Sequence, residues 1–163
     1  HNSDRRQRQM CIRDSNLPTE KRTGIVHGDY SLTNVMIGKN DPNVIAILDW
    51  ELSTLGDPCA DFNYHCLQYT MNPKLADKEY CKNQGIPVID DYVKMYSEKI
   101  EIDLTEEWDL YSAYNLFKLA GILQGILGRV RDGTAAHENA AERASGVRNL
   151  SDKAWDLVEK NFL

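Results

Sequence analysis

Two short strand-like runs flank a dense cluster of turn-forming residues, and this arrangement constrains the fold more than any other part of the sequence. The runs cover residues 34–38 and 44–50, with Lys39-Asn40-Asp41-Pro42-Asn43 between them. Turn formers between two β-rich runs are typical of a β-hairpin. A third short β-rich run, residues 24–27, precedes the hairpin.

Helical spacing of apolar residues dominates the sequence after Gly56. Asp57-Pro58 suits a helix start, because Asp can cap the first turn and Pro fits the first helical position. The spacing predicts a central helix at 106–131, capped by Thr105 and ended by Asp132-Gly133-Thr134. We therefore expect an α+β fold in which a small β-hairpin packs against a mainly helical body. The other predicted helices cover residues 61–70, 76–82, 90–100, 137–145 and 150–161.

Several residues on the predicted helices have a packing interpretation. Gly121 and Gly125 lie four residues apart on the central helix, so we expect another backbone to approach them closely. Asn115 and Lys118 on the same helix could face an acceptor site, but a structural role is equally compatible with their positions. The aromatic set Tyr64, Tyr69, Tyr111 and Tyr114 is expected in the core rather than in a substrate cage.

Charge and composition narrow the functional classes. The 163 residues carry a net charge of −6, which argues against a surface for nucleic acid or anionic membranes. No apolar run approaches the roughly 20 residues that span a bilayer. The four cysteines form no CxxC pair, which argues against a zinc knuckle or a redox motif and favours a reducing, cytoplasmic compartment.

The predicted hairpin brings three oxygen-bearing side chains together. Asp29 follows the run 24–27, the amide of Asn34 lies five residues further on, and Asp49 closes the second hairpin strand. Asn34 and Asp49 should then lie at neighbouring strand ends beside the loop that carries Asp29. Phosphoryl transfer needs such a set: one carboxylate orients and deprotonates a hydroxyl, while an amide oxygen and a second carboxylate are hard ligands for Mg²⁺.

The pattern H-G-D-x-x-x-x-N followed by I-L-D-W-E, residues 27–34 and 47–51, resembles the catalytic and metal-binding segments of the aminoglycoside phosphotransferase and choline kinase family. The resemblance implies a protein-kinase-like C-terminal lobe that transfers phosphate from ATP, or GTP, with Mg²⁺ as cofactor. The implied roles are catalytic base for Asp29, Mg²⁺ ligands for Asn34 and Asp49, a metal or substrate helper for Glu51, and loop shaping for His27 and Asp61.

Further residues resemble one branch of this family, which is found fused to acyl-CoA dehydrogenases and as free-standing bacterial phosphotransferases. These residues are 46–58, 114–118 and 122–126, so the resemblance covers most of 16–163. It implies hydroxylated acyl thioesters or related alcohols as small-molecule substrates, and a dehydrogenase partner or fusion in relatives. Thr33 stands where relatives often have Asp, so any role of that Asp does not carry over.

Residues 1–15 have a different origin in our interpretation. Arg5 to Ser15 can be back-translated into a transposon adapter used for sequencing libraries, and such segments are kept out of fold reasoning. The alternative is a disordered basic tail. On the first interpretation, residues 16–163 form a catalytic lobe without the N-terminal lobe that grips the nucleotide. We then expect the isolated chain to be inactive or very feeble.

Two other functional classes compete with the kinase interpretation. A pseudokinase-like binding module could sense a ligand or dock a dehydrogenase, but degenerate lobes usually lose one of Asp29, Asn34 and Asp49. A metal-dependent hydrolase could use the same carboxylates, but the His-rich ligand set common in such enzymes is missing. Among single residues, Asp57 is better explained as a helix cap than as a ligand, and Glu51 is equally compatible with a site role and a structural one.

Overall fold

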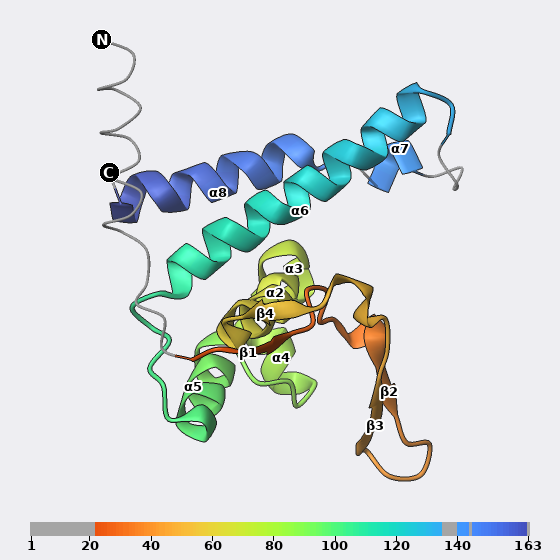
Figure 1. Cartoon of the computed structure of the whole chain (residues 1–163). Helices are drawn as coiled ribbons and strands as arrows, with labels where there is room; N and C mark the ends of the chain where they lie inside the picture. Colours follow the sequence, from red (N-terminus) through yellow and green to blue (C-terminus); the bar gives the residue numbers. More distant parts are fainter. Residues whose placement is uncertain (1–21, 135–139, 144, 163) are drawn as a thin grey trace.

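The computed structural model describes residues 22–134, 140–143 and 145–162, which form a mainly helical body with two small β-ribbons (Figure 1). Each ribbon is an antiparallel pair of strands. Short 3₁₀ helices, η1 and η2, precede β2 and β4. The strand bounds are β1 Gly24–Val26, β2 Val35–Ile37, β3 Val44–Ile47 and β4 Thr54–Gly56, and the 3₁₀ bounds are η1 Leu32–Asn34 and η2 Trp50–Leu52.

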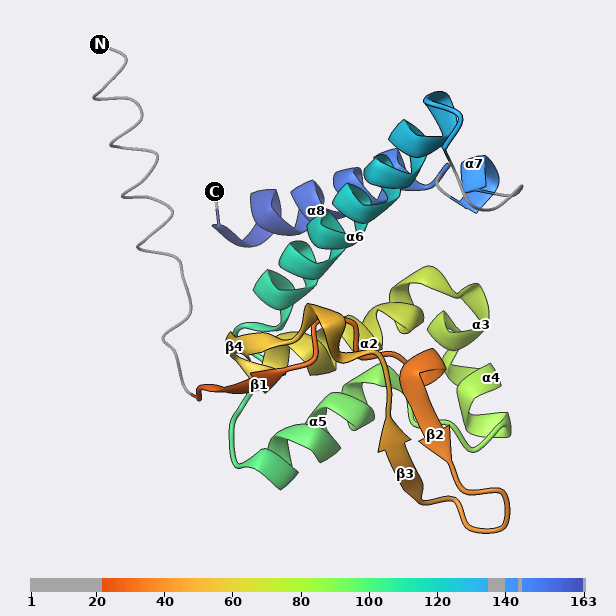
Figure 2. The ribbon, with the colours of Figure 1, turned by 45° about the vertical axis from the view of Figure 1, so that its right-hand side comes forward.

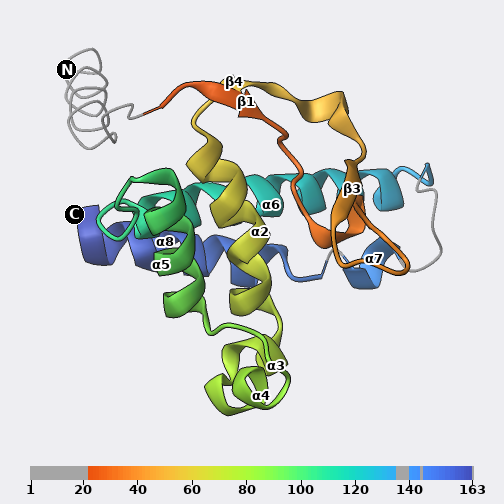
Figure 3. The same ribbon diagram turned by 90° about the horizontal axis from the view of Figure 1, so that it is seen from below.

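Helices make up the rest of the described chain. Helices α6 and α8 run side by side, α2 crosses beneath both, and the β2–β3 ribbon projects away from the helices (Figures 2 and 3). Within the described ranges, no helix combines the length and the apolar character needed to cross a bilayer. The bounds are α2 Pro58–Met71, α3 Pro73–Ala76, α4 Lys78–Asn83, α5 Ile89–Ile100, α6 Trp108–Arg131, α7 Ala140–Arg143 and α8 Val147–Phe162.

The predicted hairpin is confirmed as β2 and β3, which pair in the register Val35↔Ile47 and Met36↔Ala46. The second ribbon was not predicted. In it, β4 returns to β1 so that Ile25 lies opposite Leu55. This ribbon places the segment that follows β1, which carries Asp29, beside the start of α2, which follows β4.

Helix α2 begins as predicted, because the Asp57 carboxylate accepts a hydrogen bond from the backbone N–H of Cys59 at 2.9 Å. The expected cap of α6 is wrong. The N–H and the hydroxyl of Thr105 both donate to Asp103 in a turn, and α6 begins only at Trp108. The predicted short helix at 76–82 is instead two helices, because Asp77 caps a new one by accepting from Glu79.

Two apolar clusters form the core, and α2 contributes to both. One joins α2 to α5 and α6, and the other joins α2 to α6 and α8. A buried amide pair also ties α2 to α6: the Asn115 side chain donates to Asn63 at 3.0 Å and to the Ala60 carbonyl at 2.9 Å. The buried cluster members are Cys59, Phe62, Cys66, Val93, Leu104 and Tyr111 in the first, and Leu67, Leu116, Ala120, Leu150 and Ala154 in the second.

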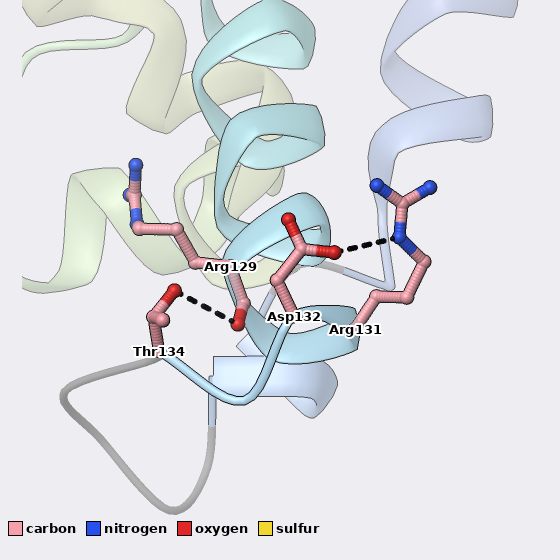
Figure 4. Close-up of polar contacts among 4 residues, drawn as sticks. All are labelled: Arg129, Arg131, Asp132 and Thr134. Atoms are coloured by element: carbon pink, nitrogen blue, oxygen red, sulfur yellow. Dashed lines mark hydrogen bonds and ion pairs between the residues drawn. The ribbon is translucent and has the colours of Figure 1, made fainter.

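The C-terminal end of α6 follows the prediction, whereas its glycines do not. The chain leaves the helix at Asp132-Gly133-Thr134, where Gly133 has φ +70° and the Thr134 hydroxyl donates to the Arg129 carbonyl (Figure 4). The expected backbone contact at Gly121 and Gly125 is absent. No atom lies within 4 Å of a Cβ built at Gly121, because α8 packs against a different face of α6.

The remaining packing expectations are met in part. Tyr111 is buried, whereas Tyr114 is 57% exposed, so the expectation of a core position is wrong for Tyr114. The predicted helix at 137–145 lies partly outside the described residues. Its described part includes α7.

Candidate active site

The loop that follows β1 is held by a carboxylate from α2. Asp61, in the first turn of that helix, accepts hydrogen bonds from the backbone N–H groups of His27 and Gly28, the latter at 2.9 Å. Both oxygens of one carboxylate therefore bind consecutive amides of the loop. Bonds of this kind replace the ladder bonds that a loop lacks, and they fix the backbone immediately before Asp29.

His27 continues this network on the other side of the loop. Its side chain is buried, its Nδ1 accepts from the Asp29 N–H at 3.2 Å, and its Nε2 lies 2.7 Å from the Leu48 carbonyl oxygen. An accepting Nδ1 requires the tautomer that carries its proton on Nε2, which then donates to Leu48. The Trp50 ring packs against the imidazole, with centroids 4.6 Å apart.

Gly28 is required by the geometry of the loop. Its φ is +83°, in the left-handed region, and a Cβ added there would lie 2.5 Å from the backbone oxygen of Leu52. An L-residue would therefore meet both an unfavourable backbone conformation and a clash. The close approach brings the loop against η2, which directly follows Asp49.

Asn34 and the segment before Asp49 are joined to the same loop. The Asn34 amide nitrogen donates to the Asp29 backbone oxygen at 2.9 Å and to the Asp29 carboxylate at 3.2 Å. The N–H of Leu48 donates to the Asn34 carbonyl at 2.8 Å. Asp49 comes next in the chain, with its side chain exposed and its backbone in the left-handed region at φ 66°. The segments that carry Asp29, Asn34 and Asp49 are thus tied together by hydrogen bonds.

Glu51 and Asp57 lie at the margin of this network. Glu51 is exposed on η2, and no bond joins it to another described residue. Asp57 caps α2 and also accepts from the Tyr111 hydroxyl at 2.5 Å. Burial raises the pKa of Tyr111, and the bond to Asp57 raises it further.

Two further side chains reach the loop, and the sequence reasoning missed their contacts. The Lys118 amine donates to the Gly28 carbonyl, and burial together with the neighbouring Asp29 carboxylate raises the pKa of the Tyr64 phenol. Tyr64 had a sequence signal, because it lies three residues after Asp61 and so shares its face of α2. Lys118 was considered for a position facing an acceptor site, but no spacing indicated its contact with Gly28, 90 residues away.

The donor set of the predicted metal ligands fits a hard cation. The described residues hold no group of three or more His, Cys, Asp or Glu side chains that could bind a metal. The predicted ligands are instead one carboxylate and one amide, with the Asn34 nitrogen directed to Asp29. The amide oxygen of Asn34 and the carboxylate of Asp49 are the kind of ligands that Mg²⁺ takes alongside water and phosphate oxygens.

Comparison with known proteins decides the family. A profile of the phosphotransferase enzyme family matches residues 3–114, more than half of the chain. The chain belongs to this phosphotransferase family. The same fold is found in the crystal structure of a Ralstonia eutropha protein assigned as an aminoglycoside phosphotransferase, with a TM-score of 0.80 and 38% identity, over 93% of this chain and 47% of that one. The expected family and the expected kinase-like fold are both confirmed.

Curated relatives of this phosphotransferase are acyl-CoA dehydrogenase family members. Mouse family member 10 is 36% identical over 149 residues, which cover 88% of this chain and 14% of the relative. Human family member 11 is 32% identical over 152 residues, which cover 90% of this chain and 20% of the relative. The chain therefore spans a fifth or less of these relatives, which confirms the expected branch of the family.

Proposed function

We propose that this phosphotransferase transfers the γ-phosphoryl group of ATP, or GTP, to a hydroxyl group of a small molecule. The proposal rests on two hydrogen bonds. The Asn34 amide donates to the Asp29 carboxylate, and the N–H of Leu48, the residue before Asp49, donates to the Asn34 carbonyl. These three segments come from a loop and from two strand ends, and phosphoryl transfer requires a proton acceptor beside oxygen ligands for a cation. Family membership and the kinase-like fold support the same reaction class.

Asp29 is the proton acceptor in this proposal. Its backbone is held through His27 and Gly28, and its carboxylate is oriented by Asn34. A carboxylate oriented in this way can accept the hydroxyl proton as the oxygen attacks phosphorus. His27 and Asp61 shape the loop and take no part in proton transfer.

Asn34 and Asp49 would hold Mg²⁺, and Glu51 is the candidate helper for the metal or the substrate. The bound cation would supply charge neutralisation at the phosphate oxygens. The left-handed backbone at Asp49 places an acidic residue where few L-residues are found, and such conformations cluster at functional sites.

The names of the curated relatives are the basis for proposing a phosphate acceptor and a partner protein. Because the curated relatives are named acyl-CoA dehydrogenases, we propose a hydroxylated acyl thioester or a related alcohol as acceptor. A dehydrogenase domain, fused or separate, would then share a metabolite with the kinase. The elements that grip ATP are proposed to lie in an adjoining lobe, because this chain matches 47% of the length of the Ralstonia eutropha structure.

Metal binding tests the proposal at its centre. In a titration of the chain with Mn²⁺ as a probe for Mg²⁺, followed by the electron paramagnetic resonance of the free ion, Asp49→Asn should weaken binding about tenfold or more, because ligand charge sets affinity. Asp152→Asn, at an exposed position on α8, is the matched control. Equal Mn²⁺ affinity in all three proteins would reject Asp49 as a ligand.

Phosphoryl transfer tests the base. With radiolabelled ATP and a panel of hydroxyacyl thioesters, Asp29→Asn in the intact protein should lower kcat by about 10²–10⁴-fold, the usual contribution of a general base. Its Mn²⁺ affinity should stay near that of the unmodified protein. A pseudokinase-like module would instead bind ligands and transfer no label to any acceptor.

A further inference from the structure

Lys118 on α6 reaches the catalytic loop. Its amine donates to the carbonyl oxygen of Gly28, the residue before the proposed base, and lies 4.9 Å from the centre of the Tyr64 ring. A lysine amine carries a full charge, and this one is placed between a backbone carbonyl and an aromatic face. The charged end of the side chain is thus engaged by the loop and by α2.

Tyr64 on α2 completes the contact. Burial raises the pKa of the Tyr64 phenol, and its interaction with the neighbouring Asp29 carboxylate raises it further. The phenol therefore keeps its proton beside the carboxylate.

The peptide unit between Gly28 and Asp29 is held at both ends. Lys118 binds its carbonyl oxygen, and the Nδ1 atom of His27 accepts from its N–H at 3.2 Å. The orientation of this peptide sets the direction in which the Asp29 side chain leaves the backbone. Asn34 then restricts rotation of the carboxylate itself, beside the Tyr64 phenol, and its remaining lone pairs are left for the acceptor hydroxyl.

We propose that Lys118 and Tyr64 are positioning residues that hold the Asp29 carboxylate in the orientation needed to accept the proton of the acceptor hydroxyl. This inference rests on the proposed function of Asp29. Lys118 acts through the Gly28 carbonyl, and Tyr64 acts through its ring, which packs against the Lys118 amine, and through its phenol beside the carboxylate. Neither residue is among the proposed metal ligands, so their effect should be separable from metal binding.

The test compares Lys118→Met and Tyr64→Phe with Lys94→Met and Tyr114→Phe, which alter exposed residues of the same types. In the intact protein, each loop variant should lower kcat by about 10–100-fold, the scale expected for a reacting group misplaced by about 1 Å. The KM for ATP and the affinity for Mn²⁺ should stay within about twofold of the unmodified values, since these depend on other residues.

Two further measurements separate positioning from folding. Lys118→Arg keeps a charged donor and should recover most of the kcat lost in Lys118→Met. The amide ¹⁵N signal of Asp29 should move in Lys118→Met and not in Lys94→Met, because that amide shares the peptide whose carbonyl Lys118 binds.

The outcomes are distinct. If the unmodified protein transfers phosphate and the loop variants keep full kcat, the positioning role is wrong and the proposed function stands. Loss of Mn²⁺ affinity in step with kcat would also overturn it, because that pattern indicates general disruption of the site. If the unmodified protein neither binds Mn²⁺ nor transfers phosphate to any acceptor, the proposed function fails first, and this inference fails with it.

Discussion

The loop that carries Asp29 and the β1–β4 ribbon are both short pieces of non-helical backbone, yet their side chains are placed in opposite ways. The loop is held by side chains that reach it from α2 and α6. The β1–β4 ribbon instead turns Ile25 and Leu55, which pair across the strands, to solvent at 68% and 75% exposure. The chain thus fixes the loop that carries Asp29 through side chains of its own helices and leaves apolar surface of the β1–β4 ribbon exposed.

Substitution of Gly28 in the loop should have the largest effect on the free energy of unfolding. Gly28→Ala is expected to lower the free energy of unfolding by about 2–5 kcal/mol, because it adds a left-handed penalty and a clash with the Leu52 carbonyl. Gly85 is the matched control, since it also has positive φ (+68°) but nothing within 4 Å of its Cβ. Gly85→Ala should cost about 1–2 kcal/mol. Equal losses in urea denaturation would show that the close approach of the loop to η2 adds nothing.

Removal of the Asp61 carboxylate, which holds the loop from α2, should have the next largest effect. Asp61→Ala leaves the N–H groups of His27 and Gly28 without their acceptor, and we expect a loss of about 2–4 kcal/mol in urea denaturation. Asp152→Ala on the exposed face of α8 should stay within about 0.5 kcal/mol of the unmodified protein. A similar value for both variants would mean that solvent replaces Asp61 at no cost.

The burial of Tyr64 beside the Asp29 carboxylate predicts a dependence of stability on pH. The pKa of Tyr64 is higher in the fold than the value of about 10 expected in the unfolded chain. Its contribution is therefore complete below pH 10 and is lost as pH rises towards its folded pKa, because the unfolded chain then releases a proton that the fold retains. Denaturation midpoints from pH 8 to 11 should fall less steeply in Tyr64→Phe than in Tyr114→Phe.

The ribbon surface should give the smallest effect. Ile25→Thr and Leu55→Thr are each expected to change the stability of the chain by about 0.5 kcal/mol or less, because both side chains are already exposed. Val26→Thr, which places a hydroxyl at the buried position next to Ile25 in the same strand, should cost about 1–3 kcal/mol. Large losses at Ile25 or Leu55 would indicate that this ribbon contributes to the core.

The parts of the fold that could be predicted were those encoded by local signals. Turn formers marked the β2–β3 hairpin, and Asp57-Pro58 marked the start of α2. Strand β4 was missed because it is three residues long and its partner β1 lies about 30 residues earlier. The start of α6 was misplaced because Thr105 bonds to Asp103, which a capping pattern does not reveal.

In the candidate site, too, features with a local sequence signal were predicted and long-range contacts were missed. The motifs located Asp29, Asn34 and Asp49, and these segments meet through hydrogen bonds of short sequence separation or across the hairpin. The bond from Lys118 to Gly28 spans 90 residues and depends on how α6 packs over α2. No spacing rule connects a helix side chain to a loop carbonyl at that distance, so only the folded chain reveals it.

The left-handed backbone at Asp49 has a practical consequence for mutagenesis. Alanine at this position would combine two losses, the carboxylate and the tolerance of a conformation that Asn, Asp and Gly adopt most readily. Loss of activity in an alanine variant would then have two explanations, the loss of a metal ligand or a changed backbone conformation at the end of the hairpin. Asparagine removes the charge and still tolerates the left-handed backbone, so it tests the ligand role of the carboxylate without changing the conformation of the turn.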